Sequence, residues 1–169
     1  MFEDIRQATH TAMLNIFETM FFIFLEPLDG NSLSNQEASE PNLDSEEPPQ
    51  PIHSGFLKSE IHFQGKYSGI LRLLLPYDFS ELLTANFMGF EEEVTEFQII
   101  DMAGELANMI CGNLFSVLDK SSVYILGSPV TQKLSPHDGA ERRDPADLTM
   151  DFLAEDQQVT VQLHFDPVP

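Results

Sequence analysis

One segment of the chain carries residue types that can do chemistry, at a spacing typical of a helix. Asp101, Glu105 and Asn108 follow one another at i, i+4 and i+7, so all three share one helix face. Gly104 and Gly112 lie on the same face and would leave the helix surface bare, so that a loop of another protein can approach closely. On such a face a carboxylate can pair with a cation, and an amide can hold a water molecule. The alternative is that these residues form only the solvated outer face of a helix, because a Glu-x-x-Asn pattern also arises by chance.

The helix that would position these residues extends from about Thr95 to Leu118. Its apolar residues repeat every three or four positions, which predicts one buried stripe. The polar face therefore points away from that stripe. Acidic residues precede the helix at positions 91–93, where the helix dipole favours negative charge. The predicted stripe consists of Ile99, Ala103, Leu106, Ile110, Leu114 and Val117.

The sequence indicates no other kind of catalytic site. Gly65 and Lys66 lack the upstream glycine of a phosphate-binding loop, and no serine lies in a nucleophile elbow. The five histidines are scattered and form no metal-ligand pair on a helix face. The single cysteine, Cys111, excludes an intramolecular disulfide and a multi-cysteine metal site, and it fits a reducing compartment. We therefore expect this chain to bind no metal ion or cofactor, so that an enzyme here would work with carboxylates and amides.

The charge balance excludes several classes of partner. The chain has 169 residues, with 28 acidic against 8 basic side chains and a formal net charge of −20. A field of this sign repels phosphate backbones and anionic lipid headgroups, so we expect neither nucleic-acid binding nor membrane binding. The apolar run Met20–Leu25 is far shorter than the roughly 20 residues of a spanning helix. The first residues are acidic where a signal peptide needs basic ones. These features predict a cytoplasmic protein.

The order of the predicted elements indicates an α+β fold in two layers. Strands joined by hairpins imply an antiparallel sheet, which the long helices would cover on one side. Apolar and polar residues alternate in both predicted hairpins, as expected for strands with one buried face. The predicted elements are a helix over 2–25, a hairpin over 56–76, a short helix capped by Asp78 or Ser80 and closed by Gly89, the helix over 95–118, a strand over 123–134 interrupted at Gly127 and Pro129, and a terminal hairpin over 148–153 and 159–165.

The chain is predicted to form a single domain with one insertion. Residues 1–28 supply the N-terminal helix and residues 55–169 the body of the domain. Between them, residues 29–54 are rich in proline, serine and acidic side chains, with no basic residue and no apolar periodicity. Such a segment cannot bury enough apolar surface to offset its ordering entropy, so we expect a mobile, dispensable insertion.

The long helix resembles the signature of the CheC/CheX/FliY group of chemotaxis proteins, and most closely that of the CheX type. The signature has Asp or Ser, then Glu four residues later, then Asn three residues after the Glu, and Asp101, Glu105 and Asn108 match it. Segments 15–20, 62–73 and 79–88 and the terminal hairpin also resemble the corresponding CheX elements. The resemblance covers nearly all of the chain except the acidic insertion, and it implies a CheC-like fold.

The resemblance implies a phosphatase acting on the aspartyl phosphate of a CheY-like receiver domain, in chemotaxis or a related two-component pathway. Glu105 and Asn108 would be the working groups, with Asp101, Gly104 and Gly112 as supporting or partner-binding residues. Mg²⁺ would be bound by the receiver domain rather than by this chain. CheC-like relatives carry two such sites, whereas the first helix here has its Asn and Glu in reversed order, at positions 15 and 18, which predicts one site per chain.

Two further expectations accompany this prediction. The resemblance implies a homodimer built through sheet edges, and the terminal hairpin is the candidate for such an edge. The alternative function is a non-catalytic binding module that docks a signalling partner through the same helix face. Asn108 separates the two functions, because a face that only binds has no need of an amide at that position.

Overall fold

The computed structural model describes residues 2–28, 55–89, 93–136, 138 and 144–167. The acidic insertion expected at 29–54 lies outside the described residues. Within these residues, seven strands form one sheet, and all of their pairings are antiparallel. The elements are α1 (Phe2–Ile16) with a π-helical turn (Phe17–Phe21), β1 (Glu26–Leu28), β2 (Phe56–Gln64), β3 (Gly69–Pro76), α2 (Tyr77–Met88), α3 (Glu96–Leu118), β4 (Ile125–Leu126), β5 (Val130–Leu134), β6 (Leu148–Ala154) and β7 (Gln157–Phe165).

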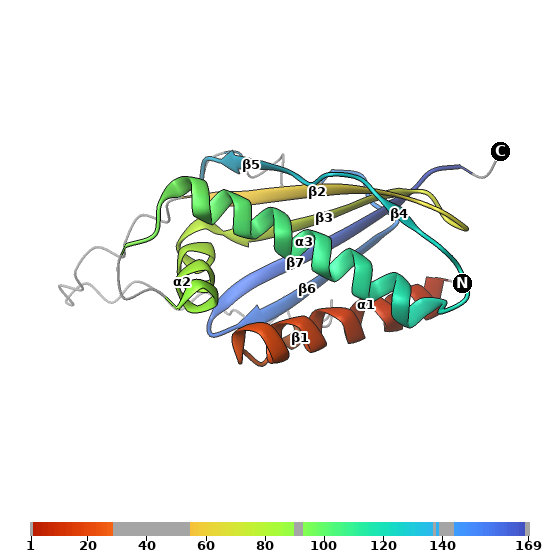
Figure 1. Cartoon of the computed structure of the whole chain (residues 1–169), viewed down its shortest axis with the longest axis horizontal. Coiled ribbons are helices and arrows are strands. Elements are labelled where there is room, and N and C mark those ends of the chain that lie inside the picture. The colour runs from red at the N-terminus through yellow and green to blue at the C-terminus, as the bar shows by residue number, and fades with distance from the viewer. Residues whose placement is uncertain (1, 29–54, 90–92, 137, 139–143, 168–169) are drawn as a thin grey trace, which may run out of the picture.

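The predicted two-layer α+β architecture is confirmed. The strand order is β1-β6-β7-β3-β2-β4, and β5 also pairs with β2. Figure 1 shows α1 and α3 crossing the same face of this sheet, with α2 at one end. The core lies between the two layers, where α3 contacts α1 on one side and β2, β3 and β5 on the other. Among the described residues, no helix is long and apolar enough to cross a membrane.

The N-terminal helix ends earlier than its apolar pattern predicted. α1 stops at Ile16 and continues only as the π-helical turn, after which Phe22 adopts a left-handed conformation with φ of 58°. The backbone N–H of Ile23 donates to the carbonyl of Phe17 at 3.1 Å, which closes the helix end. The chain then becomes extended, because β1 pairs with Phe152 and its neighbours in β6. The helical run therefore ends at Phe21, short of the end predicted at residue 25.

The first predicted hairpin is confirmed, and its alternation positions the core. Leu57, Ser59, Ile61 and Phe63 of β2 are buried against the helices, as the period-two pattern predicted. The interrupted strand also has the expected form, because β4 and β5 pair with β2 on either side of Gly127 and Pro129.

The terminal hairpin does form, but it is not a sheet edge. β7 lies between β3 and β6, and β6 in turn pairs with β1. The edges of the described sheet are instead β1 on one side and β4 and β5 on the other. The expectation that the terminal hairpin supplies a free edge is therefore wrong, because residues from the other end of the chain cover β6.

The two helix caps differ in how well the sequence predicted them. Gly89 ends α2 with φ of 64°, as expected, but the N-cap residue of α2 is Pro76, which makes no side-chain cap hydrogen bond, rather than Asp78 or Ser80. The Ser80 hydroxyl is buried and donates to the Pro76 carbonyl at 3.0 Å, so it is satisfied by the backbone of the preceding turn and does not cap the first N–H groups. Thr95 caps α3.

Candidate functional site

The cap and the buried stripe of helix α3 fix its orientation about its own axis, and with it the direction in which the candidate residues point. Its start is set by a capping box, in which the Gln98 N–H donates to the Thr95 hydroxyl at 3.3 Å and the Thr95 N–H donates to Gln98 Oε1 at 2.8 Å. The buried stripe of the helix then packs against α1 and the sheet. The prediction that Val117 belongs to the buried stripe is wrong, because its side chain is 42% exposed near the end of the helix.

The three polar residues share one face of α3, as their spacing predicted, and the structure brings them together there. Asp101 and Glu105 are exposed, and Asn108 is half-buried. Within the described residues, no hydrogen bond or ion pair engages any of these three side chains. Their polar atoms are therefore available to a partner or to water molecules.

Gly104 is covered by the chain itself, contrary to the bare surface expected there. A Cβ at this position would lie 3.3 Å from Pro129 Cγ and 3.3 Å from Thr131 Oγ1. Gly104 thus allows the chain between β4 and β5 to pack closely on the helix, and Thr131 is anchored by a 2.8 Å hydrogen bond between its hydroxyl and that of Ser59. Gly112 is half-buried, and its nearest contact, Leu126 Cδ1, would lie 3.8 Å from an added Cβ.

A small hollow of about 150 Å³ results from this packing and opens beside Glu105. One wall is α3 and the other is the segment that leads into β5. Sequence reasoning missed Pro129 and Thr131 as parts of this wall, because only the pairing of β5 with β2 brings them to the helix. The hollow is lined by Ile100, Asp101, Gly104, Glu105, Pro129 and Thr131.

The first helix does not reproduce this arrangement. Asn15 lies in α1 and Glu18 in the π-helical turn, and both are exposed. The two residues are therefore not carried on one regular helix, which is consistent with a single site per chain.

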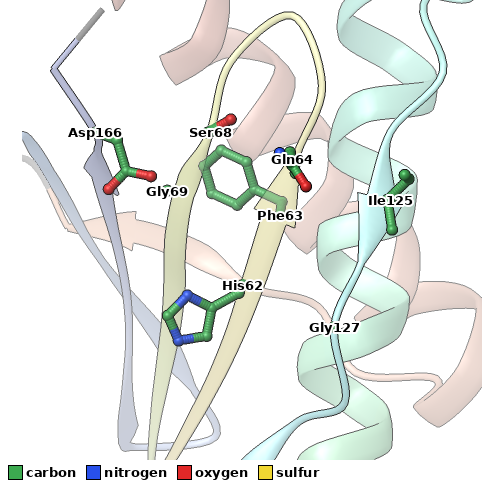
Figure 2. Close-up of a pocket in the computed structure, with 8 residues that line it drawn as sticks. All are labelled: His62, Phe63, Gln64, Ser68, Gly69, Ile125, Gly127 and Asp166. Atoms are coloured by element: carbon green, nitrogen blue, oxygen red, sulfur yellow. The ribbon is translucent and has the colours of Figure 1, made fainter. Parts of the chain in front are cut away.

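A larger hollow of about 410 Å³ lies elsewhere, between β2, β3 and the chain around β4. Figure 2 shows that the polar side chains around it, among them His62, Gln64 and Asp166, spread along its rim and do not converge. Among the described residues, no group of three or more His, Cys, Asp or Glu side chains could hold a metal ion. This hollow therefore offers no catalytic constellation.

Cys111 is not a nucleophile in this fold. It is a free cysteine on the buried side of α3, and burial raises the pKa of its thiol to about 12. The reactive thiolate is consequently absent at neutral pH. The chemistry of α3 is left to the carboxylates and the amide.

Comparisons with known proteins agree with this geometry. The family model described as chemotaxis phosphatase CheX matches residues 59–142, which include all of α3. No curated protein matches the chain in sequence.

Several solved structures share the fold at low sequence identity. Chemotaxis protein CheX from Vibrio vulnificus is 17% identical with a TM-score of 0.68, and the match covers 96% of each chain. A CheC-like superfamily protein from Shewanella sp. PV-4 is 19% identical with a TM-score of 0.66, covering 97% of this chain and 98% of that one. The CheX of a CheX-CheY-BeF3-Mg complex from Borrelia burgdorferi is 13% identical with a TM-score of 0.61, covering 96% and 98%.

Proposed function

The chain belongs to the CheX family of chemotaxis phosphatases, and we propose that Glu105 and Asn108 carry out its reaction on the aspartyl phosphate of a CheY-like receiver domain. The observation that carries this proposal is the exposed face of α3. A carboxylate and an amide lie one turn apart there, with no partner among the described residues.

Asn108 positions the attacking water molecule. Hydrolysis of an aspartyl phosphate needs a water molecule in line with the scissile bond, and there is little covalent work for the protein to do. A carboxylate in that position would face a phosphoryl group of like charge. An amide accepts one hydrogen bond from the water and donates another without this repulsion, so it orients the nucleophile in advance.

Glu105 fixes the orientation in which the receiver domain binds. It lies one turn before Asn108 and is exposed, so it can pair with a cation of the partner, most simply a lysine beside the phosphorylated aspartate. Asp101 lies one further turn back at the edge of the hollow and extends the polar surface that meets the partner.

The cofactor of the reaction belongs to the partner. Mg²⁺ held by the receiver domain would neutralise charge on the phosphoryl oxygens. The Borrelia burgdorferi neighbour supports this arrangement, because that CheX was solved together with CheY, BeF3 and Mg. A receiver domain as substrate also favours a cytoplasmic location for this chain.

We further propose that the protein is a homodimer joined through an outer strand of its sheet. In the described part of the sheet, β5 has one unpaired side, and Val130 at its start is 58% exposed. Light scattering at micromolar concentration should give the mass of two chains, and a monomer alone would contradict the dimer.

Phosphate release from an activated receiver domain tests the main proposal. A CheY-like receiver domain of the same organism is phosphorylated with a small phosphodonor, and release is followed with and without this protein. Acceleration is expected. A protein that binds the phosphorylated receiver but never accelerates its hydrolysis would instead be a binding module.

A further inference from the structure

Phe97 is a large apolar side chain that helix α3 leaves in water. It is 78% exposed in the first turn of the helix. The whole of α3 is described, and its other exposed large apolar residue, Val117, is 42% exposed and lies on the opposite side of the helix, near its end. A single exposed apolar residue is ordinary on a protein surface, so its position and surroundings must decide whether it has a role.

The position of Phe97 places it on the face proposed to meet the substrate. It precedes Asp101 by four residues and Glu105 by eight, so it lies about 12 Å from Glu105 along the helix axis. The hollow beside Glu105 is also lined by Ile100, which follows Phe97 by three residues. A protein of the size of a receiver domain that reaches Asn108 would also cover Phe97, because a standard interface buries about 800 Å² on each partner.

One basic residue reaches the acidic start of α3 beside Phe97. Lys133 of β5 reaches the start of α3, where its Nζ lies 3.2 Å from Glu96 Oε1 and 4.1 Å above the centroid of the Tyr77 ring. This cation offsets the carboxylate next to Phe97 in a chain whose net charge is −20. An acidic partner surface therefore meets less repulsion from Glu96 than it would without Lys133.

We propose that Phe97 is an apolar anchor for the receiver domain, so that the footprint of the substrate protein runs from Asn108 toward the N-terminus of α3. The inference rests on the proposed function, since it is the site at Glu105 and Asn108 that brings the receiver domain to this face. Phe97 contacts an apolar patch beside the acidic phosphorylation pocket and sets affinity, whereas Asn108 sets the rate of the chemical step.

Steady-state kinetics of Phe97→Ala test this division of roles. The variant should raise KM for the phosphorylated receiver domain about tenfold and leave kcat unchanged. Phe97→Leu should restore most of the affinity, because it keeps apolar volume at the same place. Val117→Ala is the matched control, as it shortens an exposed apolar residue of the same helix away from this face, and it should leave both constants unchanged.

Calorimetric titration with a receiver domain activated by beryllofluoride and Mg²⁺ separates this inference from the proposed function. If the wild type binds but does not accelerate hydrolysis, the proposed function fails, and a weaker affinity of Phe97→Ala still supports the anchor. An unchanged affinity and KM for Phe97→Ala would overturn the anchor even if the wild type is active. A fall in kcat alone, or no binding by the wild type, would overturn it as well.

Discussion

Asn108 follows Glu105 by one turn of α3, yet Glu105 is exposed and Asn108 is half-buried. The carboxylate is therefore placed to reach outward to a partner, whereas the amide is held closer to the protein surface. This difference suits a group that docks the substrate beside a group that must orient a water molecule. It leads to separate predictions for the two residues.

Asn108→Ala should abolish water positioning and leave the fold intact. Alanine is the best helix former, so the free energy of unfolding should not fall by more than a few tenths of a kcal/mol. Turnover of the phosphorylated receiver domain should drop at least about tenfold, which corresponds to ~1.4 kcal/mol of lost transition-state stabilisation. Asn15→Ala, which removes an exposed amide from α1, is the control and should be as active as the wild type. Wild-type turnover by Asn108→Ala would exclude the water-orienting role.

Glu105→Gln should weaken docking of the receiver domain. The substitution keeps the size of the side chain and removes its charge, so KM should rise about three- to tenfold and become less sensitive to salt. Glu18→Gln removes the same charge from an exposed position outside α3 and serves as the control. Equal salt dependence in the two variants would argue against an ion pair at Glu105.

Gly104→Val should destabilise the protein, because the new side chain would collide with Pro129 and Thr131, each 3.3 Å from the position of its Cβ. Overpacking of this kind typically costs about 1–3 kcal/mol, and urea unfolding would measure it. At Gly112 the nearest contact would be 3.8 Å away, so Gly112→Val should cost less. If both variants were equally stable, the segment before β5 would not pack on α3 as described.

Cys111 should make the protein less stable in alkaline solution. Burial raises the pKa of its thiol from 9.0 to about 12, so the folded state holds the proton that the unfolded state loses. The protonated thiol therefore costs no stability below pH 9. As the pH rises toward 12, the free energy of unfolding falls, by about 2 kcal/mol at pH 10.5. Urea unfolding of the wild type and of Cys111→Ala at pH 7.5 and 10.5 tests this. The stability advantage of the wild type should shrink at the higher pH, and a constant difference would contradict the shift.

The sequence alone determined the features that depend on local periodicity. The helical spacing of Asp101, Glu105 and Asn108 already defined one polar face, and the alternation over 56–63 already identified the buried side of β2. Such patterns are readable because each reflects a repeat of 3.6 or 2 residues within one element. The choice of Glu105 and Asn108 as the working groups also came from the sequence, and it stays a prediction until the variants are measured.

Only the tertiary structure decided which distant segments meet. β1 pairs with β6 from the other end of the chain, and this pairing ends α1 early and removes the terminal hairpin from the sheet edge. Pro129 and Thr131 cover Gly104 because β5 adds to β2, and Lys133 reaches Glu96 for the same reason. No local pattern encodes these contacts, because strand pairing and side-chain burial are set by how the whole sheet closes over the core.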